Sequence, residues 1–396
     1  MKSTDRSFSQ TKRTLWQSRL GTLAAGLCAA LLVGGLLILL NLAHHKSNAG
    51  SEPGQPVLPR QNAPLAPLHM IDASTGWDLS NGKLLRTIDG GAHWNDVTPR
   101  GIRLTSASTS TALSASLAWI AVPTAVDLPA DTILPPGTRI FRTIDGGQNW
   151  QSSVVSIILG NLKIAQMTFT TAQNGWILYN QGGIGGAERA TVVRTSDGGK
   201  TWEVTSTVLP ASTDAPPPGK LPFGGTKTGI TFLDASTGWI TGSDSVPNLS
   251  WLFITHDGGQ TWSQQHLSLP SDASPASLSL LPPTFFSATN GILPVGVGPG
   301  KTIIYVTHDQ GATWKPTTPV STSLAAVDFL DEQHGWLTDG TTLLLTGDGG
   351  HTWKRQMTNP TFTHVTQLDF VSSTHGWAVR SGGSLLQTLD GGRTWA

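Results

Sequence analysis

The apolar and polar residues of this chain follow a pattern that recurs seven times after residue 65. Its clearest part is a nine-residue box with Asp at the fourth position and Trp at the ninth. Because the distance from Asp to Trp is five residues in every box, the turn inside the box has a fixed length. The boxes are RTIDGGAHW (86–94), RTIDGGQNW (142–150), RTSDGGKTW (194–202), ITHDGGQTW (254–262), VTHDQGATW (306–314), LTGDGGHTW (345–353) and QTLDGGRTW (387–395).

An apolar companion precedes each box. In five repeats it is a Gly-Trp pair, and Trp119 and Ile292 take the same place in the second and fifth repeats. A further apolar residue lies seven residues before each companion, and 13 of the 15 tryptophans fall on this grid. The further apolar residues are Met70, Ala112, Phe169, Phe232, Phe285, Phe329 and Phe370.

Each repeat is predicted to contain four short strands joined by three turns. The first strand carries the apolar residue, the second begins at the Gly-Trp pair, the third runs into the box and the fourth starts at the box Trp. Successive box aspartates are 39 to 60 residues apart, which brackets the ~40–50 residues of one propeller blade. The sequence therefore predicts an all-β fold, a seven-bladed β-propeller over residues 65–396, because a β-sandwich would not repeat its turn chemistry in this way.

The chemistry of the box explains its fixed length. Glycine supplies the positive φ of a tight turn, and the Asp side chain accepts backbone N–H groups across it, with the preceding Thr hydroxyl adding a further bond. The box Trp is expected between neighbouring blades, where an aromatic side chain buries roughly 150–250 Å². We therefore assign a structural role to Asp89, Asp145, Asp197, Asp257, Asp309, Asp348, Asp390, Trp94, Trp150, Trp202, Trp262, Trp314, Trp353 and Trp395.

The N-terminal part has a different character. Residues 21–43 are 23 residues without a charge, long enough to span a hydrocarbon core of ~30 Å. Five basic residues and one acid precede them, so the positive-inside rule places the N-terminus in the cytoplasm. We expect a cytoplasmic tail (1–19), a single transmembrane anchor (20–43), a Pro-rich linker (44–64) and an extracytoplasmic propeller (65–396) at the cell membrane. A cleaved signal peptide is the alternative, although its apolar region usually has only ~7–15 residues.

Charge and composition limit the classes of partner and cofactor that we expect. Lys+Arg and Asp+Glu are both 25, so the net charge is zero and no nucleic-acid partner is indicated. Cys28 is the only cysteine, so no intrachain disulfide can form. The chain has no P-loop, no H-E-x-x-H and no paired C-x-x-C, so we expect neither a cofactor nor a metal. A monomeric binding module with a membrane-associated protein partner fits these observations best.

The T-x-D-G-G-x-T-W boxes resemble the bacterial neuraminidase repeat, or Asp box. Paired with the F-x5-G-W companions, they are similar to the photosystem II stability and assembly factor family of cyanobacteria and plastids. The resemblance implies a lumenal or extracytoplasmic seven-bladed propeller without catalytic activity, which binds assembling membrane-protein subunits of photosynthesis. The apolar N-terminal stretch with its tether departs from the family pattern. An adhesin or sensor ectodomain is an alternative.

A glycoside hydrolase, in particular a sialidase, is the catalytic alternative. A sialidase needs three arginines, a Tyr nucleophile with a Glu partner and a catalytic Asp, whereas Tyr179 and Tyr305 are the only tyrosines of this chain. Other glycosidases need two carboxyl groups ~5–10 Å apart. The acids in long loops that could form such a pair are Asp127, Asp131, Asp214 and Asp244.

Three arginines occupy one position, three residues before the box Asp. Arg86, Arg142 and Arg194 hold it in the first three repeats, and the other four repeats have Ile, Val, Leu or Gln there. Because Arg binds carboxylates bidentately, the three guanidinium groups could form a cationic patch for an acidic partner segment. The alternative is that each arginine pairs with a local carboxylate or carbonyl.

Length variation between repeats indicates a binding face. In an antiparallel blade, the first and third turns lie on one face, and the second turn and the inter-blade link lie on the other. The distance from the Gly-Trp position to the box Asp varies between 12 and 26 residues, so the variation falls on the second face. We expect the partner there, on loops 123–138, 181–190, 205–228 and 243–250; passive insertions are the alternative. These loops are expected to contribute exposed apolar groups, which include Ile133, Leu134, Ile184, Leu221 and Phe223.

The seventh repeat ends one residue after Trp395, so its outermost strand is missing from the pattern. An incomplete blade leaves an open edge next to the first blade. We predict that residues near Gln55–Arg60, with Val57 and Leu58 as the apolar pair, fill this place and close the ring.

Overall fold

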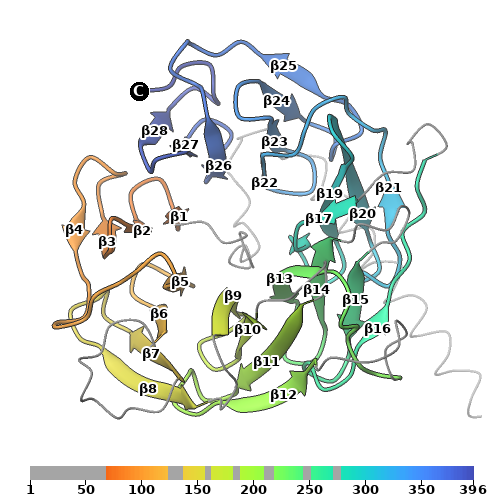
Figure 1. Cartoon of the computed structure of the whole chain (residues 1–396). Coiled ribbons are helices and arrows are strands. Elements are labelled where there is room, and N and C mark those ends of the chain that lie inside the picture. The colour runs from red at the N-terminus through yellow and green to blue at the C-terminus, as the bar shows by residue number, and fades with distance from the viewer. Residues whose placement is uncertain are drawn as a thin grey trace, which may run out of the picture. The chain divides into compact units, whose positions relative to one another are not determined.

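The computed structural model describes residues 68–123, 137–156, 162–181, 188–208, 218–243, 251–270 and 278–396. These residues belong to one compact unit, Val57–Ala396. Within them all strands pair in antiparallel fashion and no helix occurs, so the predicted all-β class is confirmed. The sheets follow one another around a common centre, and the first strand of each repeat lies innermost (Figure 1).

The strands have the order predicted for each repeat. First strands end at the shared apolar residue, second strands begin at the companion motif and third strands end at the box Thr. Fourth strands begin directly after the box Trp and not at it. The first three repeats contain β1 (Leu68–Met70), β2 (Gly76–Ser80), β3 (Lys83–Thr87), β4 (Asn95–Asp96), β5 (Thr109–Ala112), β6 (Ala118–Pro123), β7 (Gly137–Thr143), β8 (Gln151–Ser156), β9 (Leu162–Phe169), β10 (Gly175–Gln181), β11 (Arg189–Thr195) and β12 (Glu203–Thr207).

The remaining repeats follow the same scheme with two variations. Repeats four and five share one sheet, because β14 and β17 pair at Ser243 and Ser279, and the first strand of repeat five is split into β17 and β18. The strands of repeats four to seven are β13 (Thr226–Phe232), β14 (Gly238–Ser243), β15 (Leu252–Thr255), β16 (Ser263–Gln264), β17 (Leu278–Leu280), β18 (Thr284–Phe285), β19 (Gly291–Val297), β20 (Lys301–Thr307), β21 (Lys315–Pro316), β22 (Ala326–Phe329), β23 (Gly335–Thr338), β24 (Leu343–Thr346), β25 (Lys354–Gln356), β26 (Val365–Phe370), β27 (Gly376–Arg380) and β28 (Leu385–Thr388).

Aromatic stacking joins four of the repeats to the next one, where Trp119, Trp176, Trp239 and Trp336 each stack on the shared Phe of the following repeat. Trp176 of repeat three stacks on Phe232 of repeat four, with ring centroids 3.7 Å apart and an interplanar angle of 5°. The box Trp262 meets the same phenylalanine edge-on at 6.3 Å and belongs to the hydrophobic cluster that combines side chains of repeats three and four. Such pairs contribute roughly 0.5–1.5 kcal/mol beyond the area they bury. The described residues form seven hydrophobic clusters, each of which combines side chains of two neighbouring repeats.

One of these clusters joins the seventh repeat to the first. Leu68 and Met70 pack there with Trp377. Hydrogen bonds support the contact, because the Asp369 carboxylate accepts the backbone N–H of Met70 at 2.7 Å and Gln367 Nε2 donates to the carbonyl of Leu68 at 2.6 Å. The described repeats therefore form a closed ring.

The last sheet contains three strands, β26 to β28, among the described residues. Ala396 exchanges two backbone hydrogen bonds of 2.9 and 3.0 Å with Gln387, where a fourth strand would begin. The predicted closing segment Gln55–Arg60 lies outside the described residues, as do the tail (1–19), the expected anchor (20–43) and the linker (44–64). In the part of the chain that is described, no helix has the length and apolarity needed to cross a membrane.

Candidate functional site

The Asp-box turns share one hydrogen-bond scheme. In the sixth repeat the Thr346 hydroxyl donates to Asp348 Oδ1 at 2.8 Å and accepts the backbone N–H of Gly350 at 2.9 Å. The carboxylate also accepts the backbone N–H and the hydroxyl of Thr352, at 2.8 and 2.6 Å. The Thr-to-Asp bond occurs in all seven boxes.

These bonds stabilise the ionised carboxylate. The hydroxyl and then the backbone N–H of the threonine four residues on lower the pKa of Asp348 and Asp390 to about 2. The N–H and ring of His93 do the same for Asp89, whose pKa is also about 2. A carboxylate this stable is a weak base, so the box aspartates are suited to holding turns and not to proton transfer.

The three aligned arginines reach across to the next repeat. The Arg142 guanidinium lies 5.8 Å from the ring centre of its cross-strand neighbour Trp119. It also faces the next box, because a Cβ placed on Gly198 would lie 3.3 Å from its Nε. Arg86 and Arg194 repeat this arrangement, and Arg86 Nε donates to the carbonyl of Ala115 at 3.0 Å. All three are half-buried. Arg86 fits the local-pairing interpretation through its bond to Ala115, whereas the Nε atoms of Arg142 and Arg194 are buried without a hydrogen-bond partner and these side chains contact the neighbouring Trp rings instead.

Most of the predicted loop face lies outside the described residues, including Ile133, Leu134 and Ile184. Two of its apolar residues are described. Leu221 is 3% exposed and packs in the cluster between repeats three and four, with Phe223 partly buried against it. The expectation that Leu221 is exposed was therefore wrong, because the segment 218–225 folds back onto the core.

A buried lysine holds this segment in place. Lys227 is 1% exposed, and its ammonium group lies 5.0 Å from the ring centre of Trp251. The Glu188 side chain accepts the backbone N–H of Lys227 at 3.0 Å. Carbonyl oxygens surround its Nζ and accept its N–H donors. The carbonyls within 2.8 to 3.1 Å of its Nζ are those of Glu188, Phe223, Gly224 and Gly225.

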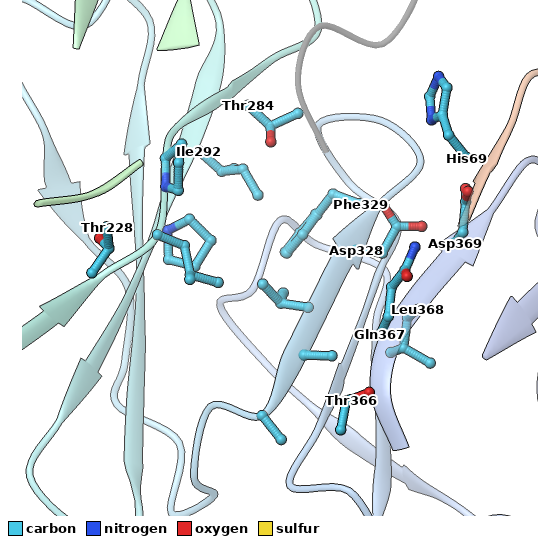
Figure 2. A pocket seen from close by; sticks show the side chains of 16 residues that line it. His69, Thr228, Thr284, Ile292, Asp328, Phe329, Thr366, Gln367, Leu368 and Asp369 are labelled. Atoms are coloured by element: carbon cyan, nitrogen blue, oxygen red, sulfur yellow. The ribbon is translucent and has the colours of Figure 1, made fainter. Parts of the chain in front are cut away.

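A cavity of about 270 Å³ lies between first strands near the centre of the ring. Figure 2 shows His69, Asp328, Gln367 and Asp369 gathered on one side of the cavity, with Thr228, Thr284 and Ile292 opposite. The repeat pattern of the sequence did not predict this cavity. Its signal is the residue before the shared apolar position, which is Thr in repeats two to five but His69, Asp328 and Asp369 in repeats one, six and seven.

Both tyrosines are buried. Tyr179 and Tyr305 are each 0% exposed, and the Tyr305 hydroxyl donates to the carbonyl of Ser268 at 3.0 Å. Burial raises the pKa of both, that of Tyr305 to about 12. Neither can reach a glycoside as a nucleophile without opening the core. The described residues contain no group of three His, Cys, Asp or Glu side chains that could hold a metal, and the loop acids Asp127, Asp131, Asp214 and Asp244 lie outside them.

The sheets, the boxes and the stacked tryptophans define an Asp-box β-propeller. The family model of the BNR/Asp-box repeat matches residues 253–264, and that of the photosynthesis system II assembly factor YCF48 matches residues 306–396. No curated protein sequence matches the chain.

Two solved structures of YCF48 share the fold. YCF48 bound to a D1 peptide aligns with a TM-score of 0.51 and 18% identity, over 87% of this chain and 99% of that one. YCF48 from Cyanidioschyzon merolae aligns with a TM-score of 0.52 and 17% identity, over 85% and 98%. These matches confirm the resemblance predicted from the boxes: the chain is similar to YCF48 in its propeller fold. The Hadza microbial sialidase Hz136 aligns with a TM-score of only 0.39 and 12% identity, over 81% and 61%, which is too low to bear on function.

Proposed function

We propose that this chain is a non-catalytic, monomeric, membrane-anchored propeller of seven blades that binds a protein partner during assembly of a membrane complex. The observation that carries the proposal is the end-to-end match to YCF48, in which almost the whole of each YCF48 chain is covered and one of the two holds a peptide. The buried tyrosines argue against the sialidase alternative, because a nucleophile must be accessible to substrate.

Seven blades are the natural count for this arrangement. Each repeat supplies its own set of antiparallel strands, and seven clusters join neighbouring repeats in a cycle that returns from Trp377 to Leu68. The three-stranded last sheet and its bond at Ala396 leave room for one added strand. We keep the proposal that residues 55–60 supply it. Deleting them should lower the melting temperature, and an unchanged value would contradict the assignment.

The anchor and the outside location rest on the uncharged residues 21–43 and the basic residues before them. Protease treatment of intact and permeabilised cells tests the orientation. Digestion of the propeller while the inner membrane is still intact supports this orientation. Protection of the propeller until the inner membrane is permeabilised contradicts it.

The partner surface is proposed on the face of the long loops. Part of this face is rigid, since Lys227 fixes the segment 218–225 against Trp251. A fixed segment loses little conformational entropy on binding, which is a property of preorganised interfaces. Trimming confined to 124–136, 182–187, 209–217 and 244–250 spares the buried Leu221 and Lys227, so it tests binding without removing these two residues.

Affinity capture from solubilised membranes of the source organism tests the function. The full-length chain should enrich a membrane-protein subunit, and the trimmed chain should enrich it less. A panel of glycosides should show no hydrolysis above background. Turnover of any glycoside that is lost with one loop aspartate would replace this proposal with the glycosidase alternative.

A further inference from the structure

Three repeats that follow one another around the ring expose an aliphatic side chain at the same position of the Asp box. The residue before the box Asp is Leu389 in repeat seven, Ile88 in repeat one and Ile144 in repeat two, and these side chains are 61%, 60% and 62% exposed. They are three of the six large hydrophobic residues that the described part of the chain exposes. Figure 1 shows their repeats side by side, as β26–β28, β1–β4 and β5–β8. Such a concentration at one position differs from apolar residues scattered singly over a surface.

The turn itself does not need an apolar residue at this position. The other four repeats have Ser196, His256, His308 and Gly347 there, all exposed, and their boxes keep the Thr-to-Asp bond. None of the three aliphatic side chains belongs to a hydrophobic cluster of the described residues. Apolar surface left in water is unfavourable, so folding gives no reason for these residues.

The three side chains occupy equivalent places on one face of the ring. In all seven repeats the residue after the box Asp donates its backbone N–H to a carbonyl of the first turn of the same repeat. The first turns and the box turns therefore form one surface, which we call the Asp-box face. A flat partner can contact all three aliphatic side chains at once. The bonds in the three repeats concerned are Gly391 to Thr374 at 2.9 Å, Gly90 to Ser74 at 2.7 Å and Gly146 to Ser116 at 3.0 Å.

The charges on this face favour a lipid bilayer as the flat partner. The box aspartates are hydrogen-bonded inside their turns. Apart from them, the turns of repeats seven, one and two contain one acid, Asp72, and one arginine, Arg393. The first turns of repeats four and six contain Asp234, Asp331 and Glu332. Because anionic lipids repel acidic side chains, the aliphatic side chains lie on the part of the face that a bilayer accepts more readily.

The place where the chain enters the ring supports the same partner. The expected anchor ends at Ala43, and Leu68 begins β1 in repeat one, the middle repeat of the three. Residues 44–67 between them span at most about 85 Å. A tether of this reach raises the effective concentration of the propeller at the bilayer, and it joins the ring at the centre of the aliphatic set.

We propose that the Asp-box face of repeats seven, one and two docks on the lipid bilayer, with Leu389, Ile88 and Ile144 inserted at its surface. The inference rests on the proposed function, because that function supplies the membrane anchor. It adds an orientation, since the opposite face, on which the protein partner is proposed to bind, is then turned away from the lipid.

The test measures membrane depth in the full-length chain, reconstituted in vesicles of phosphatidylcholine and phosphatidylglycerol. A fluorophore is attached at position 144 of the C28S/I144C protein, and lipids with a nitroxide on the acyl chain quench it only near the bilayer. The matched control is C28S/S196C, with the fluorophore at the same box position of repeat three. Quenching at 144 should exceed quenching at 196 at least about threefold, because apolar groups bound at a bilayer surface lie ~5–10 Å deep.

Adding I88S/L389S to the C28S/I144C protein should lower quenching at 144 to the level at 196. Serine is the natural residue at this position of repeat three, so the unfolding midpoint should change little. Equal quenching at 144 and 196 overturns the proposal, as does quenching at 144 that survives I88S/L389S in a folded protein.

Two further outcomes would assign the face to a protein and overturn the bilayer contact. Shielding of position 144 from water without nitroxide quenching indicates a second copy of the chain if it grows with the protein-to-lipid ratio, and the partner if it needs added partner. If 144 is not quenched while a partner is captured, this inference fails and the proposed function stands. If 144 is quenched and no partner is captured, the docking stands and the proposed function fails.

Discussion

The indole N–H of Trp377, in the seventh repeat, donates a hydrogen bond of 3.2 Å to the carbonyl oxygen of Gly90, in the first Asp box. Trp119 and Trp176 make the same bond to the first box glycine of the following repeat, at 2.9 and 3.0 Å. The interaction that joins neighbours along the chain therefore also joins the first and last repeats. The carbonyl of Gly90 has a second donor, Gln387 Nε2, at 3.1 Å.

Removal of this closing bond should weaken the whole ring. We expect Trp377→Phe to lower the free energy of unfolding by about 1–2 kcal/mol, from one lost hydrogen bond and reduced packing. Adding Gln387→Leu leaves the carbonyl without either donor, so the double variant should lose more than the sum of the single ones. Urea denaturation of both singles and the double measures this. Strict additivity would show that the two donors act separately.

The fifth box contains a test of turn strain. Gln310 has φ of 62° where the other six boxes have glycine, a region that is costly for a residue with a Cβ. Gln310 is tolerated because the aligned residue of the preceding repeat is Ile254. In the boxes that come one repeat after Arg86, Arg142 and Arg194, the guanidinium of that arginine lies against the first box glycine. Gln310→Gly should raise the free energy of unfolding by about 0.5–1 kcal/mol, the left-handed cost less the added entropy of the unfolded chain.

The reverse change in the preceding box is the matched control. Gly258→Gln should destabilise by more than 1.4 kcal/mol, about tenfold in the unfolding constant, because a Cβ there would lie 2.6 Å from Arg194 Nη1 and 3.0 Å from the carbonyl of Ala235. Chemical denaturation of the two variants gives both values. Equal and opposite small shifts would mean that backbone conformation alone explains the glycine at this position and that contact with the neighbouring arginine plays no part.

The arginines should contribute to stability and not to capture. Arg86→Met removes the bond to Ala115 and the contact over Trp77, which together are worth about 1–2 kcal/mol. Arg142→Met and Arg194→Met should behave similarly, and partner capture by each folded variant should be unchanged. A variant that keeps its melting temperature but loses capture would instead establish the cationic patch.

The Asp boxes predict how stability depends on pH. The pKa of Asp348 and Asp390 is about 2 in the folded protein, below the ordinary value of about 3.9. A carboxyl group whose folded pKa is depressed contributes stability that is present above its unfolded pKa and is lost as pH falls towards the folded one. The urea midpoint should therefore be flat from about pH 7 to 5 and should fall between about pH 4 and 2. Asp348→Asn should make this fall shallower, and an unchanged slope would contradict the assignment.

The parts that could be predicted from sequence are those with local chemistry. Box length, glycine conformation and the acceptor role of Asp89 depend on residues within one turn, and the repetition made them visible. The ends of the third strands at residues such as Thr87 followed from the same pattern. The stacking of the companion Trp on the shared Phe of the next repeat was not predicted, although both positions recur at a fixed spacing in the sequence.

The parts that were missed depend on single residues brought together by the ring. Asp328 and Asp369 look ordinary within their own strands, and only alignment of the first strands shows that they replace threonine. Leu221 lies in a stretch rich in Pro and Gly, typical of an exposed loop, and its burial depends on distant contacts of Lys227 with Trp251. A pattern of composition cannot show such a contact.

The central claim is tested most directly by comparing partner capture by two proteins. One is the full-length chain, and the other is the variant trimmed at 124–136, 182–187, 209–217 and 244–250. Quantitative mass spectrometry of material captured from solubilised membranes would measure it, with both proteins first shown to be folded by their melting curves. We predict that one membrane-protein subunit is strongly enriched by the intact chain and that trimming lowers its enrichment at least tenfold. Equal enrichment by both chains, or enrichment of no subunit by the intact one, would contradict the account.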